Sequence, residues 1–406
     1  MSKIKEITAR EIKDSRGNPT VEVELALSDS RRVVASCPSG ASVGKNEAAA
    51  IEVSKAIENI NEVIAPKLRG KSLPTGRQAE NQKEIDELMI ALDGTENKSH
   101  LGVNAILPIS IAVCRAFAAT EKNPLYKYIS QIYNPQSSIS NLKLPLPCFN
   151  FIEGGAHAEN DLDFQEFMVI PQKQSFRENF VIASQIFQNL KKILEKDFGE
   201  AGHGDEGGFA PKVNKAEQIL LSLKSAIEKY PETKIGLDAA ASQFFKEDKY
   251  FIEGQELTRT GLLSFYKNLV DEFPIIFIED PFNQDDWQGF ESIVRQMGEK
   301  ISIIGDDLTT TNIKRIKEAY NKSACNGIVI KPNQIGTVTE TLEAVKLAKS
   351  YGWRILVAHR SGETLDDFIA DLAVGVGADF IKSGAPVTPE RLAKYNRLLE
   401  IEETLG

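Results

Sequence analysis

Apolar and polar residues alternate in the first part of the chain and later follow helical spacing. Residues 3–10, 20–27 and 32–37 alternate well enough to predict a three-stranded meander, with a turn at 14–20. Helical spacing follows at about 46–66, 77–92 and 102–120. The segment around 133–147 is rich in Ser, Asn and Pro. It predicts a boundary between an N-terminal domain, 1–133, and a second domain, 134–406.

In the second domain, short β-branched runs alternate with amphipathic helical stretches. The runs lie at 234–237, 274–278, 301–304, 327–330, 354–358 and 379–381. This alternation is typical of a parallel sheet, and the regular rhythm favours a closed barrel over an open sheet. The sequence therefore predicts an α/β protein. An N-terminal α+β domain, built from the meander and helices, precedes a TIM-type eight-fold β/α barrel.

An ionisable residue follows each of the six apolar runs. These residues are Asp238, Glu279, Asp306, Lys331, His359 and Lys382. A strand that leaves the core into water is often followed by a charge, which explains one or two such positions better than six. In a parallel barrel these ends share the face that carries the active site. We therefore expect the six side chains to form one site.

The three acids come from consecutive predicted strands, and the bases come from the next three. Asp238, Glu279 and Asp306 offer hard oxygen ligands for Mg²⁺, or for Mn²⁺ in its place, and without a cation their charges would repel. Lys331 ends an apolar strand, so burial near other cations is expected to lower its pKa and make it a base. A structural salt bridge is the alternative for Lys331. Arg360 and Ser361 suit a phosphate or a carboxylate.

Composition narrows the possible partners and the location. The chain has 406 residues and a formal net charge of −10, with no basic cluster of the kind that binds nucleic acid. Its four cysteines form no CxxC pair, which favours free thiols in a reducing compartment. The N-terminus lacks an apolar signal core, and the apolar stretch 101–119 is interrupted by Asn104, Ser110 and Arg115. We therefore expect a cytoplasmic protein without a membrane span.

Twelve motifs spread over nearly the whole chain resemble the enolase family. They include DSRGNPTVEVEL at 14–25, GDEGGFAP at 204–211, IGLDAAASQFF at 235–245, IEDPF at 278–282, IKPNQIGT at 330–337 and AHRSGET at 358–364. The resemblance implies a barrel of enolase type and reversible dehydration of 2-phosphoglycerate to phosphoenolpyruvate. It also implies two Mg²⁺ ions per active site and at least a homodimer.

The resemblance also implies a role for each matching residue. Lys331 matches the base that removes the C2 proton, and Lys382 matches a group that stabilises the aci-carboxylate. Glu206, with Glu166 beside it, matches the acid that assists loss of the C3 hydroxide. The remaining matches are metal ligands at Asp238, Glu279, Asp306 and Ser42, and substrate contacts at His157, Gln165, His359, Arg360, Ser361 and Lys382.

Two other functions fit the sequence less well than this one. Another superfamily member, such as a carboxylate racemase or cycloisomerase, would usually carry a Lys-x-Lys motif on an earlier strand, where this chain has IGLDAAAS. A catalytically silent homologue that serves as a binding or structural protein should have lost a ligand or the base, and all of them are present. A further role at the cell surface is left open.

Overall fold

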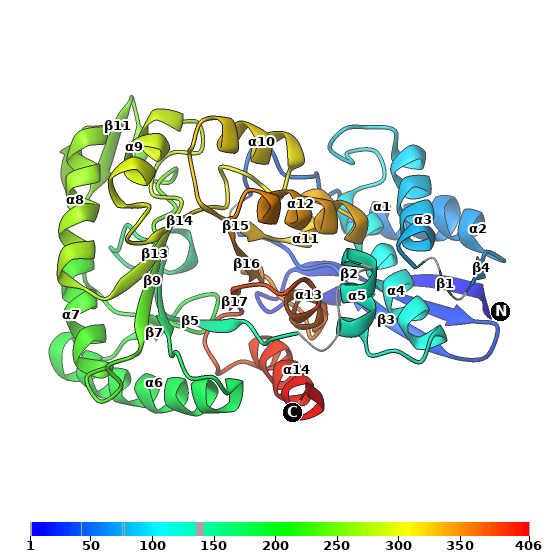
Figure 1. Cartoon of the computed structure of the whole chain (residues 1–406), viewed down its shortest axis with the longest axis horizontal. Helices are drawn as coiled ribbons and strands as arrows, with labels where there is room; N and C mark the ends of the chain where they lie inside the picture. Colours follow the sequence, from blue (N-terminus) through cyan, green and yellow to red (C-terminus); the bar gives the residue numbers. More distant parts are fainter. Residues whose placement is uncertain (1, 42, 75, 77, 135–141, 406) are drawn as a thin grey trace.

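The structure is a computed structural model that describes residues 2–41, 43–74, 76, 78–134 and 142–405. It has two parts, which lie side by side in Figure 1. Strands and helices of residues 2–134 form one part, and residues 142–405 form a barrel with its outer helices. Of the expected boundary segment around 133–147, residues 135–141 lie outside the described residues.

The predicted meander is present in the N-terminal part. Strands β1 (Ser2–Lys13), β2 (Pro19–Leu27) and β3 (Arg32–Ser36) are antiparallel neighbours. A short fourth strand, β4 (Ser72–Leu73), pairs with the start of β1 and gives the order β3-β2-β1-β4.

Helical segments make up the rest of the N-terminal part. They are α1 (Val53–Glu58), a π-helical segment η1 (Asn59–Ile64), α2 (Ala65–Leu68), α3 (Gln78–Asp93), α4 (Val103–Thr120) and α5 (Leu125–Tyr133). Helix α4 packs against β2 and β3 of the sheet. The expected helices over 77–92 and 102–120 are confirmed. Helix α4 is long and apolar enough to cross a membrane, but 83% of it is buried inside the protein, as in a core helix.

The helix expected over 46–66 begins only at Val53. The backbone N–H of Ala48 donates to Gln334 O, and that of Ala49 donates to Asn97 O. These tertiary partners hold the alanine-rich stretch outside a helix despite its high propensity. The Glu52 carboxylate then accepts the N–H groups of Ser54 and Lys55 and caps α1.

Eight strands close into the barrel of the second part. They are β5 (Leu146–Glu153), β6 (Glu166–Ile170), β9 (Lys234–Asp238), β13 (Ile275–Glu279), β14 (Ser302–Gly305), β15 (Gly327–Ile330), β16 (Arg354–Ala358) and β17 (Phe380–Lys382). Pairing of β17 with β5 closes the ring. A separate buried cluster that includes Met168, Phe277 and Leu356 fills its inside.

One barrel strand runs against the other seven. Strand β6 is antiparallel to both of its neighbours, β5 and β9, whereas every other neighbouring pair in the ring is parallel. A two-stranded antiparallel start needs no crossover helix, so the expected β/α alternation begins only after β6. The beginning of β6 therefore lies at the same end of the barrel as the carboxyl ends of the other strands.

The outer elements complete the barrel domain. The helices are α6 (Phe176–Phe198), α7 (Ala216–Ala226), α8 (Arg259–Glu272), α9 (Trp287–Met297), α10 (Ile313–Asn321), α11 (Pro332–Ile335), α12 (Val338–Ser350), α13 (Phe368–Val376) and α14 (Pro389–Leu405), with a 3-10 turn η3 (Gly155–His157). Short strands are β7 (Gly202–His203), β8 (Phe209–Ala210), β10 (Phe245–Lys246), β11 (Lys249–Ile252) and β12 (Gln255–Leu257).

Loops of the N-terminal part reach over the end of the barrel where the strand ends meet. Ser39 and Gly362 form an isolated antiparallel bridge, and Ser15 N–H donates to Glu363 O. A side chain at position 44 would lie 3.0 Å from Oδ1 of Asp307. The N-terminal part therefore forms one wall of the space above the barrel.

Candidate active site

The ionisable residues at the six predicted strand ends meet at one end of the barrel. Asp238, Glu279 and Lys382 are the last residues of β9, β13 and β17. Asp306, Lys331 and His359 come directly after β14, β15 and β16. Lys331 is half-buried and the other five are buried. The expectation that these side chains share one face is confirmed by the parallel pairing of their strands.

Lys382 lies among three buried carboxylates. Its Nζ is 2.9 Å from Oε2 of Glu166, 2.7 Å from Oε2 of Glu279 and 3.4 Å from Oδ2 of Asp238. Burial and neighbouring acids raise the pKa of Glu279 well above its usual range, and burial raises that of Asp238. The carboxylates outweigh burial at Lys382 and raise its pKa, so the ammonium stays charged.

Lys331 forms an ion pair with the Asp306 carboxylate, whose other oxygen accepts a hydrogen bond of 2.8 Å from Gln334 Nε2. The expectation that burial lowers the Lys331 pKa is wrong for this structure. Burial acts in that direction, but the charge of Asp306 outweighs it and raises the pKa. In this arrangement Lys331 makes the salt bridge that the sequence left as its alternative.

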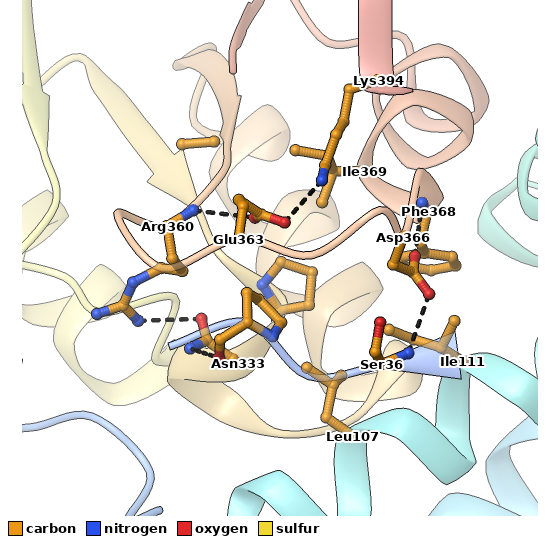
Figure 2. Close-up of a pocket in the computed structure, with 13 residues that line it drawn as sticks. Ser36, Leu107, Ile111, Asn333, Arg360, Glu363, Asp366, Phe368, Ile369 and Lys394 are labelled. Atoms are coloured by element: carbon orange, nitrogen blue, oxygen red, sulfur yellow. Dashed lines mark hydrogen bonds and ion pairs between the residues drawn. The ribbon is translucent and has the colours of Figure 1, made fainter. Parts of the chain in front are cut away.

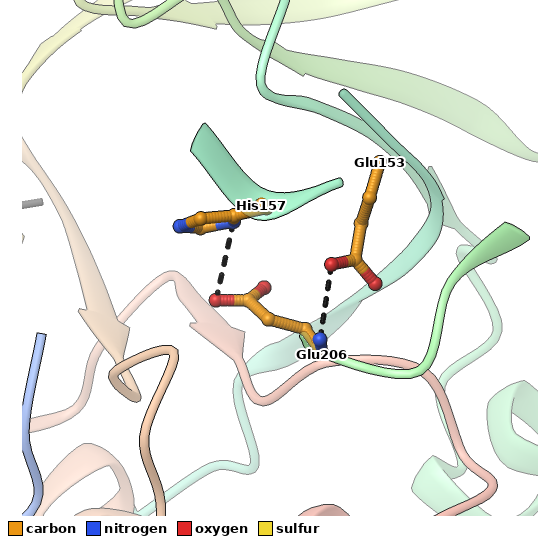
Figure 3. A group of neighbouring side chains, drawn as sticks. All are labelled: Glu153, His157 and Glu206. Atoms are coloured by element: carbon orange, nitrogen blue, oxygen red, sulfur yellow. Dashed lines mark hydrogen bonds and ion pairs between the residues drawn. The ribbon is translucent and has the colours of Figure 1, made fainter. Parts of the chain in front are cut away.

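Glu206 is held in a tight hairpin loop. Strands β7 and β8 pair around residues 204–208, and the Glu206 N–H donates to Oε2 of Glu153 at 2.9 Å. The Gly208 N–H donates to the other oxygen of Glu153. Figure 3 shows Glu153 at the backbone nitrogen of Glu206 and His157 at its carboxylate, with His157 Nδ1 3.5 Å from Glu206 Oε1. Asn150 Nδ2 donates to Oε2 at 2.7 Å.

The site therefore contains two carboxylates that share a histidine. His157 Nδ1 lies 3.4 Å from Oε1 of Glu166 as well as near Glu206. Burial acts to lower the pKa of His157, but these two acids outweigh it and raise the pKa to about 9. Burial and the nearby Glu206 raise the pKa of Glu153 to about 8. Gln165 Nε2 donates to Oδ2 of Asp238 at 3.1 Å, which places Gln165 beside the acidic group.

The basic side of the site is formed by the loop after β16. Arg360 Nη1 lies 2.7 Å from Oε2 of Glu47 and 3.0 Å from Oδ1 of Asn333. Its backbone N–H donates to Glu363, which is paired with Lys394, as Figure 2 shows. Ser361 Oγ accepts the N–H of Ala41 from the N-terminal part. Ser42, the predicted hydroxyl ligand, lies outside the described residues.

Several residues that hold this site were not among the predictions. Glu153 and Asn150 come from β5, and Arg391 comes from α14. Glu153 could have been found from the sequence, because it ends an apolar run, as the six predicted residues do. It is also followed directly by two glycines. Arg391 had no such signal, because it lies in the first turn of a helix and follows no apolar strand run.

The donor set fits a divalent cation. Asp238, Glu279 and Asp306 supply hard carboxylate oxygens. Burial, together with neighbouring acids, raises the pKa of Asp238 and of Glu279, so a cation beside them would stabilise their charged forms. Among the described residues, Asp306 also converges with Asp280 and Asp307, with one oxygen of each within 4.8 Å of the others. Asp280 accepts the N–H groups of Asp306 and Asp307 and so fixes the position of this loop beside the proposed ligands.

Comparison with known proteins agrees with this geometry. The sequence models of the enolase N-terminal domain and of the enolase C-terminal TIM barrel domain match residues 4–129 and 141–406. An enolase from Solanum lycopersicum is 45% identical over 437 residues, which cover 100% of this chain and 96% of the relative. An enolase from Elusimicrobium minutum is 45% identical over 419 residues, which cover 100% of this chain and 97% of the relative. The chain therefore belongs to the enolase family.

Proposed function

We propose that the protein catalyses the reversible dehydration of 2-phosphoglycerate to phosphoenolpyruvate, as a phosphopyruvate hydratase. One observation carries the proposal. A lysine base candidate, a carboxylic acid candidate and a set of three buried carboxylates with Lys382 lie at one end of one barrel. Removal of a proton next to a carboxylate and loss of a hydroxide from the next carbon need these groups together.

A magnesium requirement is part of the proposal. Asp238, Glu279 and Asp306 would hold one ion, and Ser42 would contribute to a second, with Mn²⁺ able to replace Mg²⁺. Bound there, the cations would supply positive charge that stabilises the dianion formed at the substrate carboxylate. They would also offset the negative charge of Asp306. Because that charge raises the Lys331 pKa, bound cations would lower the Lys331 pKa again.

The residues of this chain divide the remaining work. Lys331 accepts the C2 proton, and Lys382 holds a positive charge beside the carboxylate end of the substrate. Glu206, with Glu166 and His157 around it, delivers a proton toward the C3 hydroxyl. Arg360, Ser361 and His359 bind the phosphate, and Gln165 helps to orient the acidic side. Burial excludes water, which strengthens each of these interactions.

The domain boundary, the oligomeric state and the cellular location are also part of the proposal. We place the domain boundary at 133/134, expect at least a homodimer and expect the enzyme in the cytoplasm. No nucleic-acid or membrane partner is proposed. Sedimentation analysis of the purified chain tests the assembly independently of activity.

An absorbance assay for phosphoenolpyruvate tests the reaction directly. Purified protein with 2-phosphoglycerate and Mg²⁺ should form phosphoenolpyruvate, and a chelator should stop the reaction. Lys331→Ala should abolish turnover, whereas Lys98→Ala should retain it, because Lys98 is a buried lysine paired with Glu340 outside the site. Lack of phosphoenolpyruvate formation by folded wild-type protein with Mg²⁺ would overturn the proposal and favour a silent homologue.

A further inference from the structure

Arg391 is a fully buried arginine near the start of α14 that makes no contact with a carboxylate among the described residues. Its guanidinium instead contacts backbone oxygens, one serine hydroxyl and one imidazole nitrogen. The contacts are 2.7 Å to His359 Nδ1, 2.6 Å to Arg360 O, 2.6 Å to Ser361 O, 3.0 Å to Asp205 O and 3.5 Å to Ser15 Oγ. Burial of a charge without an oppositely charged partner costs free energy, even when protein dipoles surround it. The position of Arg391 therefore points to a specific role.

The contact with His359 fixes which ring nitrogen carries the hydrogen. A guanidinium has only donors and remains protonated in proteins, so His359 Nδ1 must accept. The neutral ring then carries its hydrogen on Nε2. An imidazolium would carry hydrogens on both nitrogens, and one of them would point at the guanidinium. The Arg391 contact therefore excludes the charged form of His359.

The Nε2–H of His359 faces the centre of the site. Nε2 lies 3.1 Å from Oε2 of Glu206, but among the described residues it has no well-aligned hydrogen-bond partner. Glu206 Oε2 already accepts from Asn150 Nδ2. The Nε2–H of His359 is therefore available to donate a hydrogen bond to a substrate oxygen bound beside Glu206, the proposed acid.

The acids around His359 would favour its charged, doubly protonated form. Glu206 and Glu166 converge on it, and His157 lies across the Glu206 carboxylate. These acids act to raise the pKa of His359, but burial and the Arg391 charge outweigh them and lower it. Within the part of the chain that the structure describes, Arg391 is thus the cation that contacts the His359 ring and offsets the two carboxylates.

Arg391 also joins separate loops of the site. Its backbone acceptors belong to the Glu206 loop and to the Arg360–Ser361 loop. Its aliphatic stem packs where Gly384 leaves room, since a Cβ at that position would lie 2.7 Å from Cδ of Arg391. One side chain therefore sets the distance between the proposed acid and the proposed phosphate-binding loop.

We propose that Arg391 is a positioning residue that keeps His359 neutral, with its hydrogen on Nε2, and holds the Glu206 loop against the Arg360–Ser361 loop. Its effect on turnover rests on the proposed function, whereas the state of the imidazole does not.

Nitrogen NMR of histidine-labelled wild-type protein tests the first half directly. The chain has only four histidines, so the ring signals are few, and loss of one set in His359→Gln assigns His359. We expect His359 to show an unprotonated Nδ1 and a protonated Nε2, unchanged from pH 6 to pH 8. Protonation of Nδ1, or of both nitrogens within this range, would overturn the proposal.

Arg391→Lys tests the second half, with Arg397→Lys as the matched control on the same helix. Arg397 is bidentate to Asp371 and lies outside the site. A lysine ammonium cannot hold all the partners of the Arg391 guanidinium at once. In Arg391→Lys we therefore expect kcat to fall by about tenfold or more, with a new loss of activity toward acid pH because loss of the contact to Nδ1 lets His359 protonate. Arg397→Lys should change neither the His359 signals nor the pH profile.

Equal behaviour of the two variants would overturn the positioning role. If Arg391→Lys does not fold, the wild-type spectrum alone decides the tautomer. A wild-type protein that shows the expected His359 signals but forms no phosphoenolpyruvate would refute the proposed function and leave the assignment of the imidazole intact.

Discussion

Glu166, the first residue of β6, is paired across the sheet with Asp238, the last residue of β9. This pairing depends on the reversed direction of β6, which brings the beginning of that strand to the end of the barrel where the other strands finish. Glu153 pairs with Glu166 from the other side. Three carboxylates thus stand in neighbouring positions, and the Lys382 ammonium contacts two of them, Glu166 and Asp238.

Replacement of Lys382 should expose the repulsion among these acids. Lys382→Met leaves buried carboxylates uncompensated, and breaking such a pair costs about 3–5 kcal/mol. Turnover should fall by roughly a hundredfold or more, because a positive charge at the substrate carboxylate is lost. Melting curves with chelator and with Mg²⁺ measure the effect on stability. We expect Mg²⁺ to raise the melting temperature of the variant more than that of the wild type.

Lys98→Met provides the control for this comparison. Lys98 is a buried lysine that lies 2.8 Å from Oε1 of Glu340, away from the proposed metal ligands. This variant should lose stability without any added response to Mg²⁺. Equal Mg²⁺ responses in Lys382→Met and wild type would contradict the assigned role of Lys382.

The glycine before Asp205 should tolerate no side chain. A Cβ at Gly204 would lie 2.3 Å from Oε2 of Glu153 and 2.7 Å from His157 O. Gly204→Ala must therefore displace Glu206 or its support, and a displacement near 1 Å can cost about a hundredfold in rate. Gly202→Ala in the same hairpin meets no atom within 4 Å among the described residues. Steady-state kinetics should show a large loss of kcat only for position 204, and similar rates would refute the close packing of this loop.

Much of the fold and of the site follows from local sequence signals. Six barrel strands were predictable because each is an apolar run that ends in an ionisable residue. Strands β5 and β6 were missed because β5 follows a proline-rich segment and no helix separates it from β6. The helix over 46–66 was predicted too long because propensity does not reveal the tertiary acceptors of Ala48 and Ala49. The pKa of Lys331 was misjudged because sequence does not show that Asp306 contacts it.

Asp86 links stability to pH at the junction of the two parts. This buried carboxylate of α3 accepts from Ser110 Oγ at 2.6 Å and from Thr339 Oγ1 of α12 at 2.6 Å. Burial nevertheless raises its pKa from 3.8 to about 6. The unfolded chain then releases this proton at a lower pH than the folded protein, so this contribution to stability is greatest below pH 4 and declines as pH rises to about 6.

Asp86→Asn isolates this contribution. At about 1.4 kcal/mol per pH unit, the full effect is about 3 kcal/mol, and about 1 kcal/mol of it falls between pH 5 and pH 7. The free energy of unfolding of the wild type, relative to the variant, should fall by that amount over this range in denaturant titrations. A difference that stays constant or grows with pH would show that Asp86 is charged throughout.

Exchange of the C2 hydrogen of 2-phosphoglycerate in deuterated water with Mg²⁺ separates the proposed roles of Lys331 and Glu206. We expect proton removal by Lys331 to precede loss of the hydroxide. Glu206→Gln should therefore still exchange the C2 hydrogen while forming little phosphoenolpyruvate, and Lys331→Ala should do neither. C2 exchange that survives in Lys331→Ala would show that Lys331 is not the base, and loss of exchange in Glu206→Gln would show that the two residues do not act in separate steps.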